Sequence, residues 1–430
     1  MTRLCNCRII AGMEAPACTK QNERINVRHI DVLDGIRALA ILLILWFHLW
    51  QQNWLMPYFY VPFLAKLGLP GVVNLDFIPR SGFLFVDMML LLSAFCLFLP
   101  HARAVFLGEP VPDTLTFYKK RLVRIVPPYY LSVLLIFFFV ALPDGAYVTW
   151  KDAVIDLGST LTFTQVFLPG VLLGTKINGV LWTAAIEMQF YLIFPLLALC
   201  FRKKPLLTYL GMVSCSMAYL FFFALPDTEG LRVTLNQLPG FLGVFANGML
   251  AAYALTWLST KTGRKPLLSL LATAAAIGCI LLIGACEKAA PGTSPVQIWQ
   301  ASYRYRLSLL FALFTVSAAL SAKWFRFLFS NRVMVFLAGI SYNMYIWHQW
   351  LFVKLKDWRI PYYEGDTPPN FLGDRAWQWQ YTLVCLALAL GAAVLATYLF
   401  ERPMANLLLN RKEPTHASTV SDTGHMLHED

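Results

Sequence analysis

Two ionisable residues, Arg37 and His48, interrupt the apolar stretch LDGIRALAILLILWFH at positions 33–48. They are eleven positions apart, which on an α-helix is about three turns and about 16 Å, so both side chains leave the same stripe. Arg37 is then expected at the cytoplasmic membrane edge and His48 about halfway across. An ionisable side chain at that depth should face the protein interior or a wet cavity. The structural alternative is a histidine that only packs against a neighbouring helix, with a snorkelling arginine.

Other apolar stretches also contain polar residues that are suited to chemistry. Glu187 lies in LWTAAIEMQFYLIFPLL, His348 lies in SYNMYIWHQWLF, and Asp87 lies in FLFVDMMLLLSAF. Each could by itself be a polar contact between helices. Two histidines and two carboxylates in one bundle instead favour a common polar chamber, because histidine takes and returns a proton near neutral pH. We therefore predict that His48, Glu187 and His348 are catalytic.

A pair of arginines, Arg121 and Arg124 in YKKRLVRIVPPYYL, is spaced to share one face of a helix. Paired guanidinium groups suit phosphate oxygens. Together with Arg37 they predict an anion site at the cytoplasmic mouth of the chamber, although ordinary positive-inside charge would give the same pattern. A ligand with phosphates at one end and a reactive thioester at the other, such as acyl-coenzyme A, would suit an anion site at the mouth and a base in the depth.

The composition indicates which elements must position these residues. The chain has 430 residues, of which 58% are hydrophobic and only 14% charged, which is too apolar for a soluble protein of this size. Runs of about 20 apolar residues recur, as membrane-crossing helices require. The prediction is an all-α polytopic membrane protein in the lipid bilayer, with ten transmembrane helices near residues 38–57, 82–100, 128–142, 182–200, 205–224, 237–256, 267–286, 304–320, 333–353 and 380–399.

Lysine and arginine are about twice as frequent in the N-terminal tail and the alternate loops that share its side as in the opposite loops. The positive-inside rule then places both termini in the cytoplasm of a plasma-membrane protein. The formal charge of +11 is therefore interpreted as topology and not as nucleic-acid binding. We expect a cytoplasmic tail over residues 1–30, a membrane domain over 31–404 and a disordered cytoplasmic tail over 405–430. The nine cysteines suggest neither a disulfide framework nor a metal site.

The ordered segments LDGIRALAILLILWFH, FVDMMLLLSAF, RLVRIVPPYYL, LWTAAIEMQFYLIFPL, SYNMYIWHQWLF and FERP resemble the landmarks of the acyltransferase 3 family of integral membrane acyltransferases. The resemblance covers about Val32 to Pro403. It implies a ten-helix core, acyl-coenzyme A as donor, most often with an acetyl group, and a hydroxyl of a sugar or envelope glycan as acceptor. Two positions depart from the family pattern: Ala94 replaces a common glycine, and Met188 replaces a common second acidic residue.

The family's site residues can be carried over position by position. Its first-helix arginine and histidine match Arg37 and His48, and its two-arginine motif matches Arg121 and Arg124. Its acidic position matches Glu187. The late tyrosine-tryptophan-histidine segment matches Tyr345, Trp347 and His348.

The resemblance leads to a mechanism in which His48 acts as a general base on the acceptor hydroxyl or carries the acyl group itself. Glu187 or Asp34 would orient His48. The acceptor would approach along residues 58–80, 143–181 and 354–379. Seven aromatic side chains there are suited to stack on sugars or to form an interfacial belt: Trp54, Tyr58, Tyr60, Tyr362, Tyr363, Trp377 and Trp379.

Two other classes of function remain open from the sequence. A proton-coupled membrane transporter would use the buried histidines and carboxylates as a relay. A receptor or assembly factor with a degenerate core would not need these polar residues for its activity.

Overall fold

The computed structural model describes residues 30–409, except for residue 228 and the segments 263–264 and 291–294. The expected N-terminal tail and most of the expected C-terminal tail lie outside these residues. The beginning of the latter continues a short helix, α17 (Arg402–Leu408). These described residues are all-α apart from one small hairpin, as the sequence predicts.

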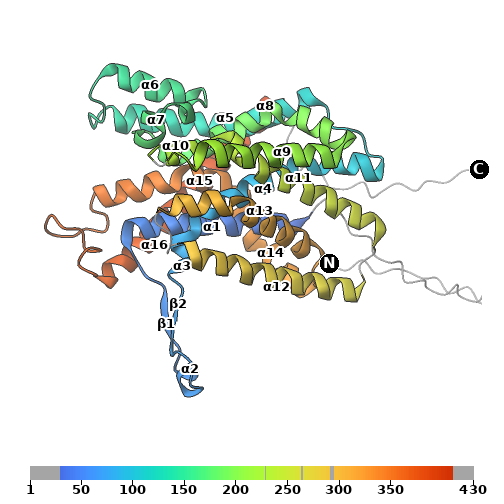
Figure 1. Cartoon of the computed structure of the whole chain (residues 1–430). Helices are drawn as coiled ribbons and strands as arrows, with labels where there is room; N and C mark the ends of the chain where they lie inside the picture. Colours follow the sequence, from blue (N-terminus) through green and yellow to red (C-terminus); the bar gives the residue numbers. More distant parts are fainter. Residues whose placement is uncertain (1–29, 228, 263–264, 291–294, 410–430) are drawn as a thin grey trace, which may run out of the picture.

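Long helices form the bundle in Figure 1, and each of the ten predicted spans falls on one of them. They are α1 (Asp31–Asn53), α4 (Phe85–Leu107), α5 (Thr114–Ile136), α8 (Trp182–Lys203), α9 (Pro205–Tyr219), α11 (Leu238–Lys261), α12 (Pro266–Ala289), α13 (Val296–Leu320), α15 (Arg332–Asp357) and α16 (Arg375–Leu395).

The number of membrane spans is smaller when it is judged by length and composition. Within the part of the chain that the structure describes, eight helical segments are apolar enough to cross a bilayer. A ninth is possible if α13 and α14 (Lys323–Ser330), which are bent by 113°, count as one span. Of the ten predicted spans, α15 is the one that does not meet this criterion. Its interior polar residues Asn343, His348 and Gln349 lower its hydropathy.

Short elements connect the long helices. The elements between α1 and α4 in the sequence are β1 (Tyr58–Tyr60), α2 (Pro62–Lys66), β2 (Val72–Asn74), α3 (Phe77–Ser81) and the 3₁₀ turn η1 (Gly82–Leu84). The others are α6 (Trp150–Leu161), α7 (Pro169–Gly174), α10 (Leu231–Thr234), the 3₁₀ turns η3 (Gln165–Phe167) and η4 (Gly179–Leu181), and the π-helical turns η2 (Phe137–Ala141), η5 (Leu220–Ala224) and η7 (Ala396–Glu401).

The two ends of the bundle differ. The antiparallel β1–β2 hairpin, α6 and α7 lie at one end, which we call the hairpin end (Figure 1). Because α1 ends next to the hairpin, its start at Asp31 lies at the other end, which we call the terminal end. Helices α1, α5 and α15 therefore run from the terminal end to the hairpin end, whereas α4, α8 and α16 run back.

Two helix boundaries differ from the sequence prediction in ways that matter for the site. Helix α1 begins at Asp31 rather than at residue 38, because acidic residues in a first helical turn lower hydropathy but interact well with the helix dipole. His48 therefore lies near the hairpin end of α1 and not halfway along it. Helix α5 begins at Thr114, where the Asp113 carboxylate accepts a hydrogen bond from the backbone N–H of Thr116 at 2.7 Å. Arg121 and Arg124 are consequently inside this helix.

Glycines allow the inner helices to approach one another closely. A Cβ at Gly35 of α1 would overlap the carbonyl oxygen of Phe329 in α14, and one at Gly248 of α11 would overlap that of Leu91 in α4. Small residues at helix contacts are typical of membrane proteins. The apolar window of the α4 segment is 78% buried and that of the α11 segment 67%, whereas the windows of α9 and the α16 segment are only 17% and 22% buried. The inner layer thus holds the site, and the outer layer presents leucines to the surroundings.

Candidate active site

His48 and His348 meet where α1 packs against α15. The His348 Nε2 atom is 3.0 Å from the His48 Nδ1 atom. His348 is fully buried, and its Nδ1 atom is 2.7 Å from the carbonyl oxygen of Tyr345. The His48 Nδ1 atom is also 3.1 Å from the carbonyl oxygen of Ile44. Two of the three residues predicted to be catalytic are therefore in direct contact.

The two carbonyl oxygens determine which ring nitrogens carry hydrogen. A carbonyl can only accept a hydrogen bond, so His348 Nδ1–H donates to Tyr345, and its Nε2 atom is left as an acceptor. His48 Nδ1–H donates to this Nε2 atom and to Ile44. In the neutral His48 ring the lone pair is therefore on Nε2, which has no hydrogen-bond partner among the described residues. A histidine held in this way can take a proton from a hydroxyl.

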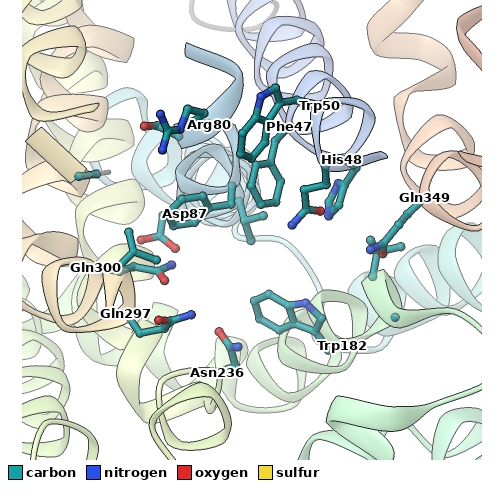
Figure 2. A pocket seen from close by; sticks show the side chains of 18 of the residues that line it. Phe47, His48, Trp50, Arg80, Asp87, Trp182, Asn236, Gln297, Gln300 and Gln349 are labelled. Carbon is teal, nitrogen blue, oxygen red and sulfur yellow. The ribbon is translucent and has the colours of Figure 1, made fainter. Parts of the chain in front are cut away.

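His48 lines a cavity of about 520 Å³ at the hairpin end, which falls within the usual range for ligand pockets. Figure 2 shows His48 and Gln349 on one side of the open space, facing Gln297 and Gln300 across it. The wall is rich in side-chain amides and in aromatic rings. The polar and aromatic lining includes Phe47, Trp50, Gln51, Arg80, Phe83, Asp87, Trp182, Asn236, Gln297, Gln300 and Gln349. His348 is not part of this wall, because it lies behind His48.

Asp87 contributes to the wall as half of a buried ion pair. Its carboxylate is 3.3 Å from Arg304 Nε, and both side chains are 1% exposed. Arg304 also donates to the carbonyl oxygen of Leu235 at 2.7 Å and lies 4.0 Å above the ring of Phe241. The pair joins α4 to α13 across 217 positions. It fixes this part of the wall, and its two opposite charges compensate each other.

Glu187 is not in contact with His48. It lines a separate cavity of about 40 Å³ together with Thr183 and Tyr342. Tyr345 lines both cavities and is held by a hydrogen bond of 2.8 Å from the Thr183 hydroxyl. The expectation that Glu187 or Asp34 orients His48 is therefore corrected, because His348 occupies that place. Asp34 instead lies 3.7 Å from Arg37.

The three predicted anion-binding arginines gather toward the terminal end. Arg124 lies close enough to Arg37 and Arg121 for mutual charge repulsion. Arg121 lies 6.0 Å from the centre of the Tyr191 ring, and Glu187 attracts Arg37. Three guanidinium groups that crowd together in this way favour a bound anion. Glu187 therefore lies between this cluster and the larger pocket, because its own small cavity shares Tyr345 with that pocket.

The aromatic residues proposed to stack on an acceptor are elsewhere. None of the seven lines the large pocket, and Trp377 is buried. The rings in the wall are that of Tyr345 and four that the sequence analysis did not single out: Phe47, Trp50, Phe83 and Trp182. The amides Asn236, Gln297 and Gln300 were also missed, because they lie at helix ends, where polar residues carry no signal in an apolar pattern. The polar residues Asn53 and Asn343 serve helix contacts, with hydrogen bonds to Thr382 and Glu401.

A metal site was not expected, and within residues 30–409 as described no group of three or more histidine, cysteine or acidic side chains is arranged to hold a metal ion.

Comparison with known proteins gives two findings. A family model described as an acyltransferase domain, Acyl_transf_3, matches residues 30–403. The chain is also similar to a curated viral protein, "Putative acetyltransferase ORF330" of Acidianus two-tailed virus. The two are 27% identical over 276 residues, which cover 63% of this chain and 73% of the viral protein. No solved structure was found to match the chain.

Proposed function

Because the chain belongs to the acyltransferase 3 family and is a multi-pass membrane O-acyltransferase, we propose that it transfers an acetyl group from acyl-coenzyme A to a carbohydrate hydroxyl. The observation that carries the proposal is the pair of histidines at a large pocket, with an arginine cluster at the opposite end of the bundle. In this proposal the membrane is the plasma membrane, and the terminal end of the bundle is cytoplasmic.

The arginine cluster supports coenzyme A as the carrier of the acyl group. Arg37, Arg121 and Arg124 would hold its phosphates, because guanidinium groups form paired hydrogen bonds with phosphate oxygens. The distance along α1 from Arg37 to His48 is about 16 Å. A donor with its charges at one end of a long flexible arm can occupy both positions at once, whereas a free acyl phosphate cannot.

The lining of the large pocket supports a carbohydrate acceptor. Side-chain amides such as Asn236, Gln297 and Gln300 both donate and accept hydrogen bonds, as sugar hydroxyls do. The ring faces of Trp50 and Trp182 provide flat apolar surfaces for the C–H face of a sugar. The acceptor would enter from the hairpin end, where an envelope glycan is exposed.

His48 is the proposed general base and His348 its positioning residue. As the acceptor oxygen attacks the thioester carbonyl, its proton passes to His48 Nε2, and the new C–O bond forms. The C–S bond then breaks, and the proton is passed on from His48 to the departing thiolate. His348 accepts the hydrogen bond from His48 Nδ1 and so keeps the lone pair on the pocket side.

The decisive experiment is coenzyme A thiol release by the purified protein in nanodiscs with an added glycan acceptor. Acetylated product and free thiol should appear together in the wild type, and both should require His48. Arg121→Ala should weaken the dependence of thiol release on acyl-coenzyme A. Lys203→Ala is its matched control and should not, because it removes another basic charge from the terminal end. If the wild-type protein transports protons and releases no thiol, the transporter alternative is correct instead.

A further inference from the structure

A third cavity, which is apolar, lies on the outer side of α1, away from His48. Its volume is about 310 Å³, and it lies between α1, the base of the hairpin and α16, which lie side by side in Figure 1. Its walls are almost entirely apolar, with Leu42, Trp46 and Leu49 from α1 and Trp379 and Leu386 from α16. Because α16 belongs to the outer layer of helices, this groove opens on the surface that faces the hydrocarbon of the membrane.

One charged side chain, Arg375, lies at the hairpin end of the groove. Its guanidinium group is 4.4 Å from the centre of the Tyr58 ring and donates one long hydrogen bond, 3.5 Å, to the carbonyl oxygen of Met56. No ion pair of Arg375 occurs among the described residues. The neighbouring carboxylate of Asp374 is occupied at the start of α16, where it accepts hydrogen bonds from the backbone N–H groups of Ala376 and Trp377.

The length of the groove matches one leaflet of a bilayer. Arg375 and Leu386 are eleven residues apart on α16, which corresponds to about 16 Å along the helix. Half of a hydrocarbon core of about 30 Å is about 15 Å. A chain that begins at Arg375 and follows the groove to Leu386 therefore ends near the middle of the membrane, as a phospholipid acyl chain does.

We propose that this groove is a binding site for an anionic phospholipid of the leaflet at the hairpin end. One acyl chain lies against Trp46, Leu49 and Leu386, and the phosphate accepts hydrogen bonds from Arg375, which forms no ion pair within the part of the chain that the structure describes. Basic residues at the membrane surface attract anionic lipids in this way. The apolar walls explain why the site takes a lipid and not a free phosphate ion.

Occupation of the groove would support the helix that carries His48. Trp46 and Leu49 flank His48 in the sequence of α1 and point into the groove, whereas His48 faces the large pocket on the other side. A lipid in the groove therefore fills the outer side of α1 at the level of the proposed base. The site itself depends only on the groove and Arg375, and it would exist whatever reaction the pocket performs.

The test is native mass spectrometry of the purified protein released from micelles that contain phosphatidylglycerol or phosphatidylcholine with identical acyl chains. The wild type should retain phosphatidylglycerol in preference to phosphatidylcholine. Arg375→Gln should weaken retention of phosphatidylglycerol about five-fold, because a basic residue near the surface contributes about 1 kcal/mol. Arg359→Gln is the matched control, since Arg359 is also at the hairpin end and also lies over a ring, that of Tyr363.

A second variant tests the groove independently of the charge. Leu386→Trp fills the groove and should abolish retention of both lipids at this site while the melting temperature shows that the protein is folded. Equal retention of phosphatidylglycerol by the wild type and Arg375→Gln would overturn the proposal. It would likewise be overturned if Leu386→Trp changed the oligomeric mass but not the bound lipid, because the groove would then be covered by a second copy of the chain.

Discussion

Replacing His348 with alanine should slow acyl transfer modestly, whereas replacing His48 with alanine should nearly abolish it. The difference follows from the two acceptors on His48 Nδ1–H. Without His348, the carbonyl oxygen of Ile44 at 3.1 Å still holds this hydrogen, so the reactive tautomer survives with one hydrogen bond fewer. A neutral hydrogen bond contributes about 0.5–1.5 kcal/mol, which corresponds to about a 2- to 13-fold fall in kcat. Loss of the general base itself costs about 100- to 10,000-fold.

The assay is initial-rate kinetics in proteoliposomes, with kcat and KM determined separately for the donor. The KM for acyl-coenzyme A should not change in either variant, because the arginine cluster is about 16 Å away along α1. His348→Gln should recover much of the lost rate, since its amide oxygen can accept the hydrogen bond from His48. If His348→Ala is as inactive as His48→Ala and glutamine does not restore the rate, His348 is itself the base. Wild-type acylation by His48→Ala would end the assignment of His48.

Three further predictions test other parts of the structure. Arg121→Ala or Arg124→Ala should raise the KM for acyl-coenzyme A about ten-fold, with partial rescue by lysine, because a charge-assisted hydrogen bond contributes at least about 1.5 kcal/mol; an unchanged KM with inverted membrane orientation would show that these arginines serve only topology. A cysteine at Ser418 should be protected from an impermeant thiol reagent in intact cells and one at Asp366 should be labelled, once reactive native cysteines are removed; the reverse pattern would refute the donor assignment. Asp87→Asn leaves Arg304 buried without its charged partner and should lower the free energy of unfolding by about 3–5 kcal/mol, measured as a fall in melting temperature. Asp76→Asn is the control, because it removes only the partly exposed pair with Arg80 and should cost at most about 1 kcal/mol.

Much of the fold could be predicted from the sequence because the bilayer imposes a simple rule on composition. Each predicted span coincides with a long helix, although α15 is recognised as a span only if its polar residues are set aside. The first residues of the helices were predicted less accurately than their existence. Asp31 and Asp34 of α1, and the basic residues early in α5, look like loop residues to a hydropathy average. In the structure they lie in the first turn of α1 and in the N-terminal half of α5.

Contacts between helices were harder to predict than the helices. The spacing of Arg37 and His48 shows that they share a stripe, but nothing in one sequence tells that His48 meets His348 after 300 positions. Glu187 was therefore expected to orient His48, whereas the side chain that contacts His48 is His348. Asp87 was noticed as a polar interruption, yet its ion pair with Arg304 depends on how α4 and α13 pack, which is determined by side-chain shapes along both helices.

The arginine cluster and the pocket lie at opposite ends of the bundle, and this separation has an electrical consequence for the proposed reaction. The acyl group would pass toward the hairpin end, while the proton of the acceptor hydroxyl would pass the other way to the coenzyme A sulfur. Taken as an acyl cation exchanged for a proton, the two movements carry the same charge in opposite directions. No net charge would then cross the membrane, so the equilibrium of acylation would be independent of the membrane potential, unlike that of an electrogenic pump.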